Sequence, residues 1–360
     1  MDFLRGAFDI FYNKIKPIIF RTTQTDPETA HKIFSFFCQT LYRTRLDKLI
    51  LDNSANYNDN QPLIPLSCAA GLNKNAQIPP TVLKYLGFDR VVVGTVTADY
   101  FEGNKRPRVI RYPETESLVN WMGLPGIGCK QVSERLKRYG EHNVPLTINL
   151  MATPGKKDDE ALKDISKTIQ ETQDIPYVDR FELNISCPNT HSLEGRLDAR
   201  RENVRLAKKM IEIVLEQKRD SQELYLKVSP DLDKETIDML YEETSPHVNG
   251  YTTTNTTTQY NHEFLNPIPE KGGASGNALY DLSLSLQKEF QKRINESGNQ
   301  DRLSVIACGG INSRFRLLSR YSSGAKEAQI YTGFIFKGPG LLRELRQKQN
   351  PEYEKLRERG

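Results

Sequence analysis

From residue 63 onward, short apolar segments alternate regularly with longer segments in which apolar residues have helical spacing. The predicted strands lie near 64–69, 90–95, 145–150, 179–185, 223–228, 249–254, 303–308 and 327–332. The predicted helices lie near 79–86, 129–139, 158–172, 199–218, 234–245, 279–297, 313–323 and 338–348. Eight strands with interleaved helices over roughly 300 residues favour a closed parallel barrel over an open sheet. The predicted fold class is therefore α/β, a TIM (β/α)8 barrel with a two-helix extension at its N-terminus.

Two helices are predicted within residues 1–50. The first repeats apolar residues at close to i, i+4 and i+8 spacing: Phe3, Leu4, Phe8, Phe11 and Ile15. Pro17 is expected to end it, and the second helix is expected to begin with Asp26 as N-cap and Pro27 at its first position. Both helices have aromatic residues on one side and basic residues on the other. This pattern is typical of helices at a membrane interface, and equally of helices that only pack on the barrel.

Composition narrows the possible partners and compartments. The net charge of +4 is too small to indicate nucleic acid, and residues 1–50 carry +3 of it, with eight Lys/Arg against five Asp/Glu. No apolar run approaches the roughly 18 residues of a spanning helix, and charged residues interrupt every early apolar stretch, so no signal peptide is expected. The five cysteines form no Cys-x-x-Cys pair, which predicts no zinc or iron–sulfur site and suits a reducing compartment. Residues 51–62 are polar and predicted to be a linker, which leaves 63–348 for the barrel and 349–360 for a tail.

Small, polar and cationic residues follow the predicted strands, where a parallel barrel binds its ligands. Three glycine-rich segments stand out: 272–276, Gly309 with Gly310, and 331–333. Glycines after the last two strands let backbone N–H groups approach a phosphate, so these segments indicate a phosphorylated cofactor. Lys74 and Lys227 would each be costly to bury without an anion. A reduced flavin and a carboxylate substrate would supply both anions.

Residues 180–190 combine a strand with a polar turn. Phe181, Leu183 and Ile185 recur at period two, as expected for a half-buried strand, and Pro188 stops the strand. Cys187 therefore lies where a strand ends and a loop begins. A buried, inert cysteine is the simpler interpretation, but the neighbouring carboxamides and proline favour a catalytic role.

The chain resembles the dihydroorotate dehydrogenase family over nearly its whole length. The resemblance rests on residues 69–75, 102–113, 184–190, 227–231, 254–257, 272–276 and 331–339, in this order. It implies an FMN enzyme that oxidises dihydroorotate to orotate in the de novo synthesis of UMP. In such a reaction a base takes the C5 proton and flavin N5 takes a hydride from C6. Cys187 would be that base, since a free thiol has a pKa of about 8.5 that nearby cations lower.

The resemblance also implies which residues hold the ligands. The substrate residues would be Lys74, Asn120, Met122, Gly123, Leu124, Asn184, Asn189, Asn255 and Thr256. The FMN residues would be Ala69, Ala70, Gly71, Lys74, Gly94, Thr95, Asn149, Asn184, Lys227, Thr254, Ser275, Gly276, Cys308, Gly309, Gly310, Ile330, Tyr331 and Thr332. Asparagine offers both a donor and an acceptor, which suits a cyclic imide. The segment after Thr190 would be a lid that excludes water.

The electron acceptor is the point on which the motifs disagree. Residues 26–31 and 331–339 resemble the membrane-associated, quinone-dependent class (class 2), in which His31, Arg111 and Tyr331 fall on positions that line the quinone tunnel. Cys187 stands where that class usually has serine, and residues 120–125 and 149–153 also depart from it, the first of these resembling the soluble classes. The expected partners are dihydroorotate or orotate, a quinone and a membrane surface, with no nucleic acid. The expected location is peripheral, on the cytoplasmic face of a bacterial plasma membrane.

Three alternatives remain. A soluble dihydroorotate dehydrogenase would use fumarate or NAD and would be cytoplasmic. A tRNA-dihydrouridine synthase has a similar cysteine, but that family adds a helical RNA-binding domain after its barrel, whereas here the extra helices come first. A non-catalytic flavin-binding barrel would have lost the base or the substrate asparagines, and this sequence keeps both.

Overall fold

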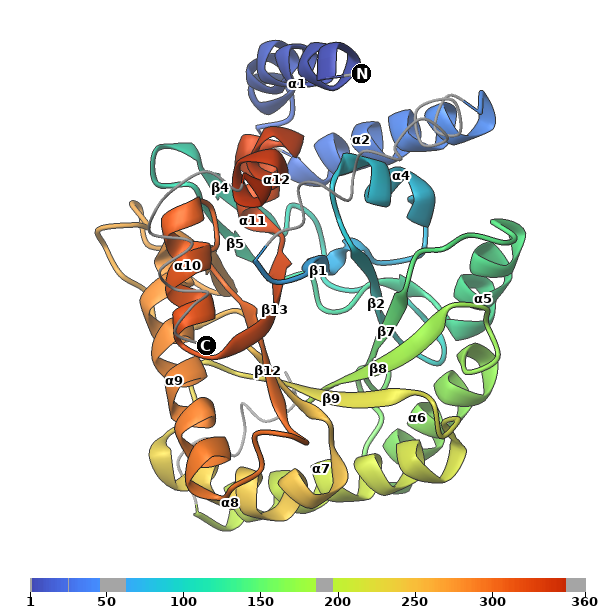
Figure 1. Cartoon of the computed structure of the whole chain (residues 1–360), viewed down its shortest axis with the longest axis vertical. Coiled ribbons are helices and arrows are strands. Elements are labelled where there is room, and N and C mark those ends of the chain that lie inside the picture. Colours follow the sequence, from blue (N-terminus) through green and yellow to red (C-terminus); the bar gives the residue numbers. More distant parts are fainter. Residues whose placement is uncertain (1, 25, 46–62, 186–196, 348–360) are drawn as a thin grey trace.

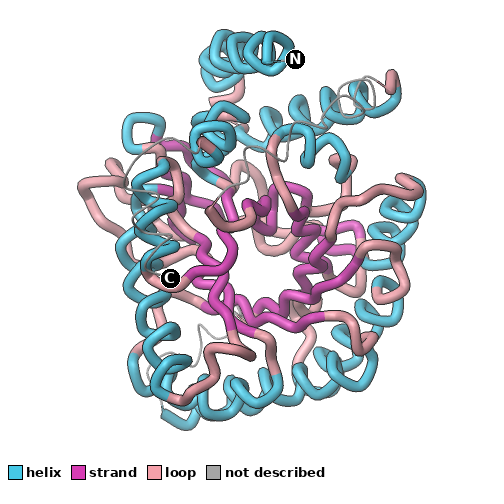
Figure 2. The backbone as a smooth tube through the Cα atoms, viewed as in Figure 1, coloured by secondary structure: helices cyan, strands magenta, loops and turns pink. Residues whose placement is uncertain are grey.

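The computed structural model describes residues 2–24, 26–45, 63–185 and 197–347 (Figure 1). A closed barrel of parallel strands forms its centre, in the order β1-β13-β12-β10-β9-β8-β7-β2, and Figure 2 shows it as a ring surrounded by helices. The barrel strands are β1 (Leu66–Asn73), β2 (Arg90–Val96), β7 (Leu146–Leu150), β8 (Val178–Asn184), β9 (Glu223–Val228), β10 (Gly250–Thr253), β12 (Ser304–Cys308) and β13 (Ala325–Ile330). The predicted α/β barrel and its eight strands are confirmed, with strand ends shifted by a few residues.

The helices between the strands also follow the sequence pattern. They are α4 (Pro80–Leu86), α5 (Cys129–Arg138), α6 (Asp158–Thr172), α7 (Leu197–Gln217), α8 (Lys234–Thr244), α9 (Tyr280–Glu296), α10 (Arg314–Ser322), α11 (Thr332–Lys337) and α12 (Pro339–Arg346). Single 3₁₀ turns lie at Pro113–Thr115, Ser245–His247 and Asn277–Leu279. Residues 331 and 332 were predicted as the end of the last strand, but β13 ends at Ile330 and α11 begins at Thr332.

The barrel strands are buried on both faces. All five residues of β7 are buried, as are Phe181 and Leu183 of β8. The expectation that β8 is half-buried is wrong, because Glu182 and Asn184 on its other face are buried as well, inside the barrel. Helices cover the outer face of a parallel barrel and packed side chains fill its inner face, so neither face of a strand meets water.

Two small sheets, which the sequence did not indicate, are built from loops beside the barrel. One has three antiparallel strands in the order β11-β5-β4: β4 (Val109–Tyr112), β5 (Ser117–Asn120) and β11 (Gly273–Gly276). The other pairs β3 (Tyr100–Phe101) with β6 (Gly126–Ile127). In the first sheet Asn120 lies opposite Gly273, so the loop after β2 and the loop after β10 are joined.

The first N-terminal helix is longer than expected. Helix α1 (Asp2–Thr22) continues past Pro17, so the prediction that Pro17 ends it is wrong. A proline removes one backbone hydrogen bond, and tertiary contacts on both sides of it hold this helix. Lys16 Nζ donates to Phe336 O at 2.6 Å, and the ring of Phe20 packs edge-on against Phe336 at 5.8 Å. The side chains of residues 1–11 lie outside the described part, so Phe3, Leu4, Phe8 and Phe11 keep only their predicted roles.

The second N-terminal helix, α2 (Pro27–Arg43), begins at Pro27 as predicted. Asp26 does not cap it through a backbone N–H; its carboxylate accepts a bond from Thr29 Oγ1 at 2.9 Å instead. Phe34 of α2 packs on the main core, whereas Ile33 and Phe36 are exposed. Among the described helices, none combines the length and the apolarity that crossing a bilayer requires.

Candidate active site

One large cavity, of about 2790 Å³, is lined by residues at the carboxyl ends of the barrel strands. Residues of α1 and α2 line it too. A single small-molecule site usually occupies roughly 300–1,000 Å³, so this cavity has room for more than one ligand. Every predicted site residue within the described ranges lines it except Gly94 and Asn149.

Gly94 and Asn149 lie in the neighbouring strands β2 and β7. Gly94 has a φ of +128°, and a Cβ at this position would lie 2.2 Å from the backbone oxygen of Asn149. The close approach of two strands therefore explains the glycine. The predicted contact of both residues with a cofactor remains a prediction.

Residues that follow β12 and β13 line the cavity and have backbone N–H groups without a backbone acceptor in the described chain. In the described chain, the N–H groups of Gly310 and Ile311 donate to no acceptor, and those of the first turn of α11 have no partner within the helix. Gly310 has a φ of +67°, and a Cβ on it would lie 2.6 Å from Tyr280 Cβ. Ser275 Oγ lies 2.9 Å from Thr332 Oγ1. Unpartnered N–H groups and hydroxyls at a helix start form a site that suits a phosphate.

A buried carboxylate lies inside the barrel behind this site. Glu182 is 0% exposed and accepts bonds from Asn149 Nδ2 at 2.7 Å, Thr252 Oγ1 at 2.6 Å and Gln329 Nε2 at 2.6 Å. Its partners come from three other strands, which explains how a fully buried charge is stabilised. Glu182, Thr252 and Gln329 were not among the site residues predicted from the sequence. An acidic residue between Phe181 and Leu183 in a buried strand was the available signal.

Lys227, at the end of β9, belongs to the same buried group. Its Nζ lies 3.1 Å from Gln329 Oε1, 3.7 Å from Cys308 Sγ and 3.8 Å from Glu182 Oε1. Burial would lower the pKa of Lys227, but the Cys308 thiol and the Glu182 carboxylate together raise it above its ordinary value. Lys227 is therefore a cation at neutral pH, and it is one of the residues that line the cavity.

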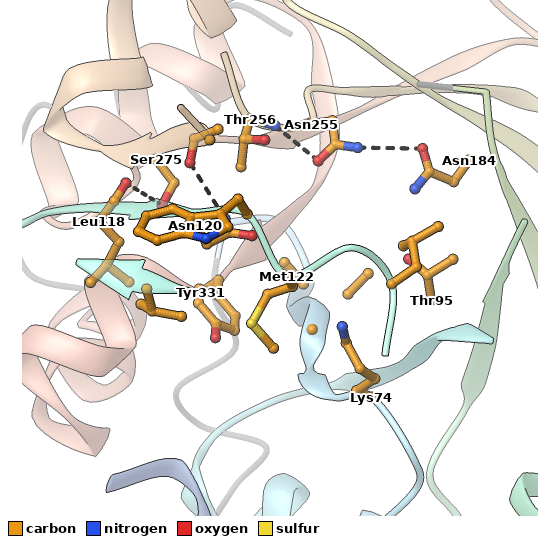
Figure 3. A pocket seen from close by; sticks show the side chains of 18 of the residues that line it. Lys74, Thr95, Leu118, Asn120, Met122, Asn184, Asn255, Thr256, Ser275 and Tyr331 are labelled. Carbon is orange, nitrogen blue, oxygen red and sulfur yellow. Dashed lines mark hydrogen bonds between the residues drawn. The ribbon is translucent and has the colours of Figure 1, made fainter. Parts of the chain in front are cut away.

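Predicted substrate residues converge on the cavity from several loops (Figure 3). Asn255 Nδ2 donates to Asn184 Oδ1 at 3.3 Å, and Asn255 Oδ1 accepts from the Thr256 N–H at 2.9 Å. Asn120 Nδ2 donates to Gly273 O at 3.4 Å. Lys74 is half-buried, and its pKa is lowered to about 8, chiefly by burial and then by Arg108. The arrangement offers amide donors and acceptors beside one cation.

The three residues predicted to bind a quinone lie on the side of the cavity nearest the N-terminal helices. His31 Nε2 lies 2.9 Å from Gln77 Nε2, while His31 Nδ1 is buried without a partner in the described chain. Burial, followed by the charge of Lys74, lowers the pKa of His31 to about 4, so the ring is neutral at pH 7. Burial raises the pKa of Tyr331 to about 12, so its hydroxyl stays protonated.

Arg111 lines the cavity and also binds the C-terminal end of α1. Its Nη2 donates to the carbonyls of Phe20 at 3.0 Å and Thr23 at 2.7 Å, and its guanidinium lies 4.3 Å from the centre of the Phe20 ring. Arg111 therefore holds the end of α1 against β4.

Cys187 and Asn189 lie outside the described residues, as does the predicted lid. The cysteines that are described are all buried: Cys38, Cys68, Cys129 and Cys308. Burial raises the pKa of each of these four thiols, to about 12 for Cys68. None of them is a thiolate at neutral pH, so none competes with Cys187 as a base. Within the described ranges, no cluster of three or more His, Cys, Asp or Glu side chains could hold a metal ion.

The fold and the site define an α/β-barrel enzyme in which the residues after the last strands suit a phosphate. A sequence model of the family "dihydroorotate dehydrogenase" matches residues 56–351. The chain belongs to the dihydroorotate dehydrogenase family.

Individual relatives agree with this assignment. A dihydroorotate dehydrogenase (quinone) of Acidithiobacillus ferrooxidans is 32% identical over 356 residues, covering 93% of both chains. Proteins of the same name from Idiomarina loihiensis and Coxiella burnetii are each 30% identical, covering 93% of this chain and 98% and 96% of their own.

Two solved structures share the fold. Crystal structures of DHODH from Eimeria tenella, one with ferulenol and one ligand-free, superpose with TM-scores of 0.69 and 0.65 at 23% and 24% identity. They cover 82% and 78% of this chain and 82% of each Eimeria chain.

Proposed function

We propose that this protein oxidises dihydroorotate to orotate with FMN, in the de novo synthesis of UMP, and passes the electrons to a quinone. The observation that carries the proposal is the continuity of the cavity. The same cavity is lined by the residues that suit a phosphate, by Asn120, Asn184 and Asn255 with Lys74, and by apolar residues of α1 and α2. A reaction that passes electrons from a polar substrate through one flavin to a lipid-soluble acceptor needs all three kinds of residue around one cavity.

The residues present fit FMN. The unpartnered N–H groups of Gly310 and Ile311, with Ser275 and Thr332, suit its phosphate. The cation of Lys227 would lie beside the flavin ring, where it would favour the reduced, anionic form. Bound FMN supplies the hydride acceptor. Further contacts to FMN are proposed for Ala69, Ala70, Gly71, Thr95, Asn184, Thr254, Gly276, Cys308, Gly309, Ile330 and Tyr331, all of which line the cavity.

The substrate would lie among the asparagines. Lys74 would pair with its carboxylate, and Asn120, Asn184 and Asn255 would bond to its ring amides. Met122, Gly123, Leu124, Asn189 and Thr256 complete the proposed set. Cys187 would take the C5 proton onto its thiolate, and bound FMN would accept the hydride from C6, which carries both electrons of the oxidation.

The quinone would enter between α1 and α2. Ile15 and Ile19 of α1 and Phe34 of α2 line the cavity near His31 and Tyr331. Ile18, Ile33 and Phe36 are exposed on the same pair of helices, with exposed fractions of 62%, 43% and 68%. We therefore propose that residues 1–50 bind a membrane surface, helped by roughly 1 kcal/mol per basic residue near anionic lipid. The protein would then be peripheral, on the cytoplasmic face of a bacterial plasma membrane.

The domain division follows the same reasoning. Residues 1–50 would provide the access to quinone and membrane, and 63–348 would bind FMN and substrate. The proposed linker 51–62 and the tail 349–360 lie outside the described residues.

Turnover with three acceptors tests the function. The purified protein should be yellow and release one FMN per chain on denaturation. With dihydroorotate as donor, a ubiquinone analogue should be reduced faster than fumarate or NAD. Fumarate or NAD as the preferred acceptor would assign the chain to a soluble type, the alternative favoured by Cys187 and residues 120–125. A folded, colourless protein that takes up no FMN would refute the cofactor.

A further inference from the structure

Arg320 of α10 is a buried cation without an acidic partner. It is 0% exposed, and in the described chain it forms no ion pair with a carboxylate. Its Nη2 donates to Gly309 O at 2.7 Å and to Ser283 Oγ at 2.9 Å, and its Nη1 donates to Gln287 Oε1 at 3.2 Å. Burial lowers the pKa of Arg320 to about 10, so it stays charged at neutral pH. An uncompensated buried charge is costly and implies an anion nearby.

Arg316 precedes Arg320 by one helical turn and binds the backbone carbonyl of Gly310, the residue after Gly309. Its Nη1 donates to Gly310 O at 2.8 Å and also to the side chain of Asn277. The two guanidinium groups lie on the ring of Tyr280, at 4.1 Å for Arg316 and 5.0 Å for Arg320. Arg316 forms no ion pair in the described ranges either. Two like charges are thus held close together behind the Gly309–Gly310 loop.

Peptide geometry connects these cations to the cavity. The carbonyl of one residue and the N–H of the next belong to one planar unit and point in opposite directions when the bond is trans, as it is at both of these peptides. The carbonyl of Gly309 and the N–H of Gly310 belong to one peptide unit. The carbonyl of Gly310 and the N–H of Ile311 belong to the next. A cation on each oxygen polarises the peptide and makes the opposite N–H a stronger donor. Both N–H groups belong to residues that line the cavity and have no acceptor in the described chain.

We propose that Arg320 and Arg316 are positioning residues for the phosphate of the flavin nucleotide, which they hold through the Gly309 and Gly310 peptides without touching it. The phosphate is the anion that balances the buried charge of Arg320 and the half-buried charge of Arg316. This inference rests on the proposed binding of FMN. It predicts that both arginines affect the affinity for a phosphorylated flavin and leave the affinity for the isoalloxazine ring unchanged.

The test compares two flavins that differ only in the phosphate. Apoprotein is titrated with FMN and with riboflavin, and binding is followed by quenching of flavin fluorescence. We expect Arg320→Gln and Arg316→Gln each to weaken FMN binding by about tenfold or more, with less than a twofold change for riboflavin. Arg320→Lys should keep most of the FMN affinity, because it retains the charge. Arg302→Gln is the matched control, since Arg302 Nη1 also donates to a backbone carbonyl, that of Val248 at 3.1 Å, but at the amino ends of the strands.

The titrations distinguish failure of the proposed function from failure of the inference about the two arginines. If the wild-type apoprotein binds no FMN, the proposed function fails. If it prefers FMN to riboflavin and both glutamine variants keep that preference, the function stands and the inference about the arginines is overturned. Equal losses for both flavins would also overturn it, since they would indicate a purely structural role. Should Arg320→Gln fail to fold, Arg316→Gln decides, because Arg316 is only half-buried.

Discussion

Cys187 is the residue whose replacement separates proton transfer from flavin binding. Cys187→Ala should leave FMN bound and slow flavin reduction by dihydroorotate roughly 10²–10⁴-fold, the range for loss of a general base. Cys187→Ser should keep part of the rate, shifted to higher pH, because a hydroxyl loses its proton less readily than a thiol. Anaerobic stopped-flow bleaching of the flavin measures both. An unchanged rate in the alanine variant would mean that another group is the base.

His31 should make stability depend on pH. Its pKa is lowered from 6.5 to about 4, so as the pH falls the unfolded chain binds this proton before the folded chain does. The folded state therefore loses stability between pH 6.5 and pH 4, by an amount on the order of 2 kcal/mol, and keeps it above that window. The free energy of unfolding should fall more between pH 7.5 and pH 5.0 for the wild type than for His31→Gln, as measured by denaturation at both pH values. An equal loss in both proteins would refute the assignment.

Single residues were predictable where their position along the chain was enough. Lys227 follows a strand, so the barrel alone predicts that it reaches the ligand end. Glu182 was missed because its partners, Asn149, Thr252 and Gln329, lie on strands that become neighbours only when the barrel closes. Gly94 was expected at a ligand, but close strand pairing is sufficient to explain it.

At the scale of elements, Glu28 links α2 to two arginines just before β4, a contact that a single substitution can test. Arg108 is 5% exposed and donates to Glu28 at 2.9 and 3.1 Å, and Arg106 lies 3.2 Å from the same carboxylate. Glu28→Gln should lower the free energy of unfolding by about 1–3 kcal/mol, because it leaves a buried guanidinium without its anion. Hydrogen exchange should also speed up in α2 before it does in the barrel strands.

The control for this contact is a surface pair. Glu296 lies 3.8 Å from Lys292 with both side chains exposed, so Glu296→Gln should change stability by less than about 0.5 kcal/mol. If Glu28→Gln has no greater effect than this control, the contact does not hold α2 in place.

Elements were predictable where a long periodic segment specified them. The barrel strands and the helices on them have such segments, since each helix covers one strand pair with an apolar face. The short strands β4, β5 and β11 have four residues each, too few for a clear periodic pattern. β4 and β5 form a hairpin, but β11 joins them from far along the chain. Pro17 was misjudged because contacts of α1 with residues 334–336, far along the chain, outweigh the local cost of a proline.

For the whole molecule, removal of the N-terminal helices should separate the two half-reactions. A chain lacking residues 1–48 should still let dihydroorotate reduce the flavin, because the substrate and phosphate residues belong to the barrel. It should lose quinone turnover and binding to liposomes that contain anionic lipid. Stopped-flow reduction, steady-state quinone assays and liposome sedimentation measure the three activities. Full quinone turnover by the truncated enzyme would contradict the proposed route.

The contact between α1 and α11 has a consequence for how the chain is made. Tyr12 donates to Ile335 O at 2.8 Å across 323 positions of sequence, so α1 is fixed by a helix that is synthesised much later. At roughly 5–20 residues per second the ribosome needs about 15–65 s to complete that span. Throughout this interval α1 lacks its contacts with residues 334–336, and we expect a nearby lipid surface to take their place. Membrane attachment would therefore precede barrel closure, which protease protection of ribosome-arrested chains in the presence of vesicles would reveal.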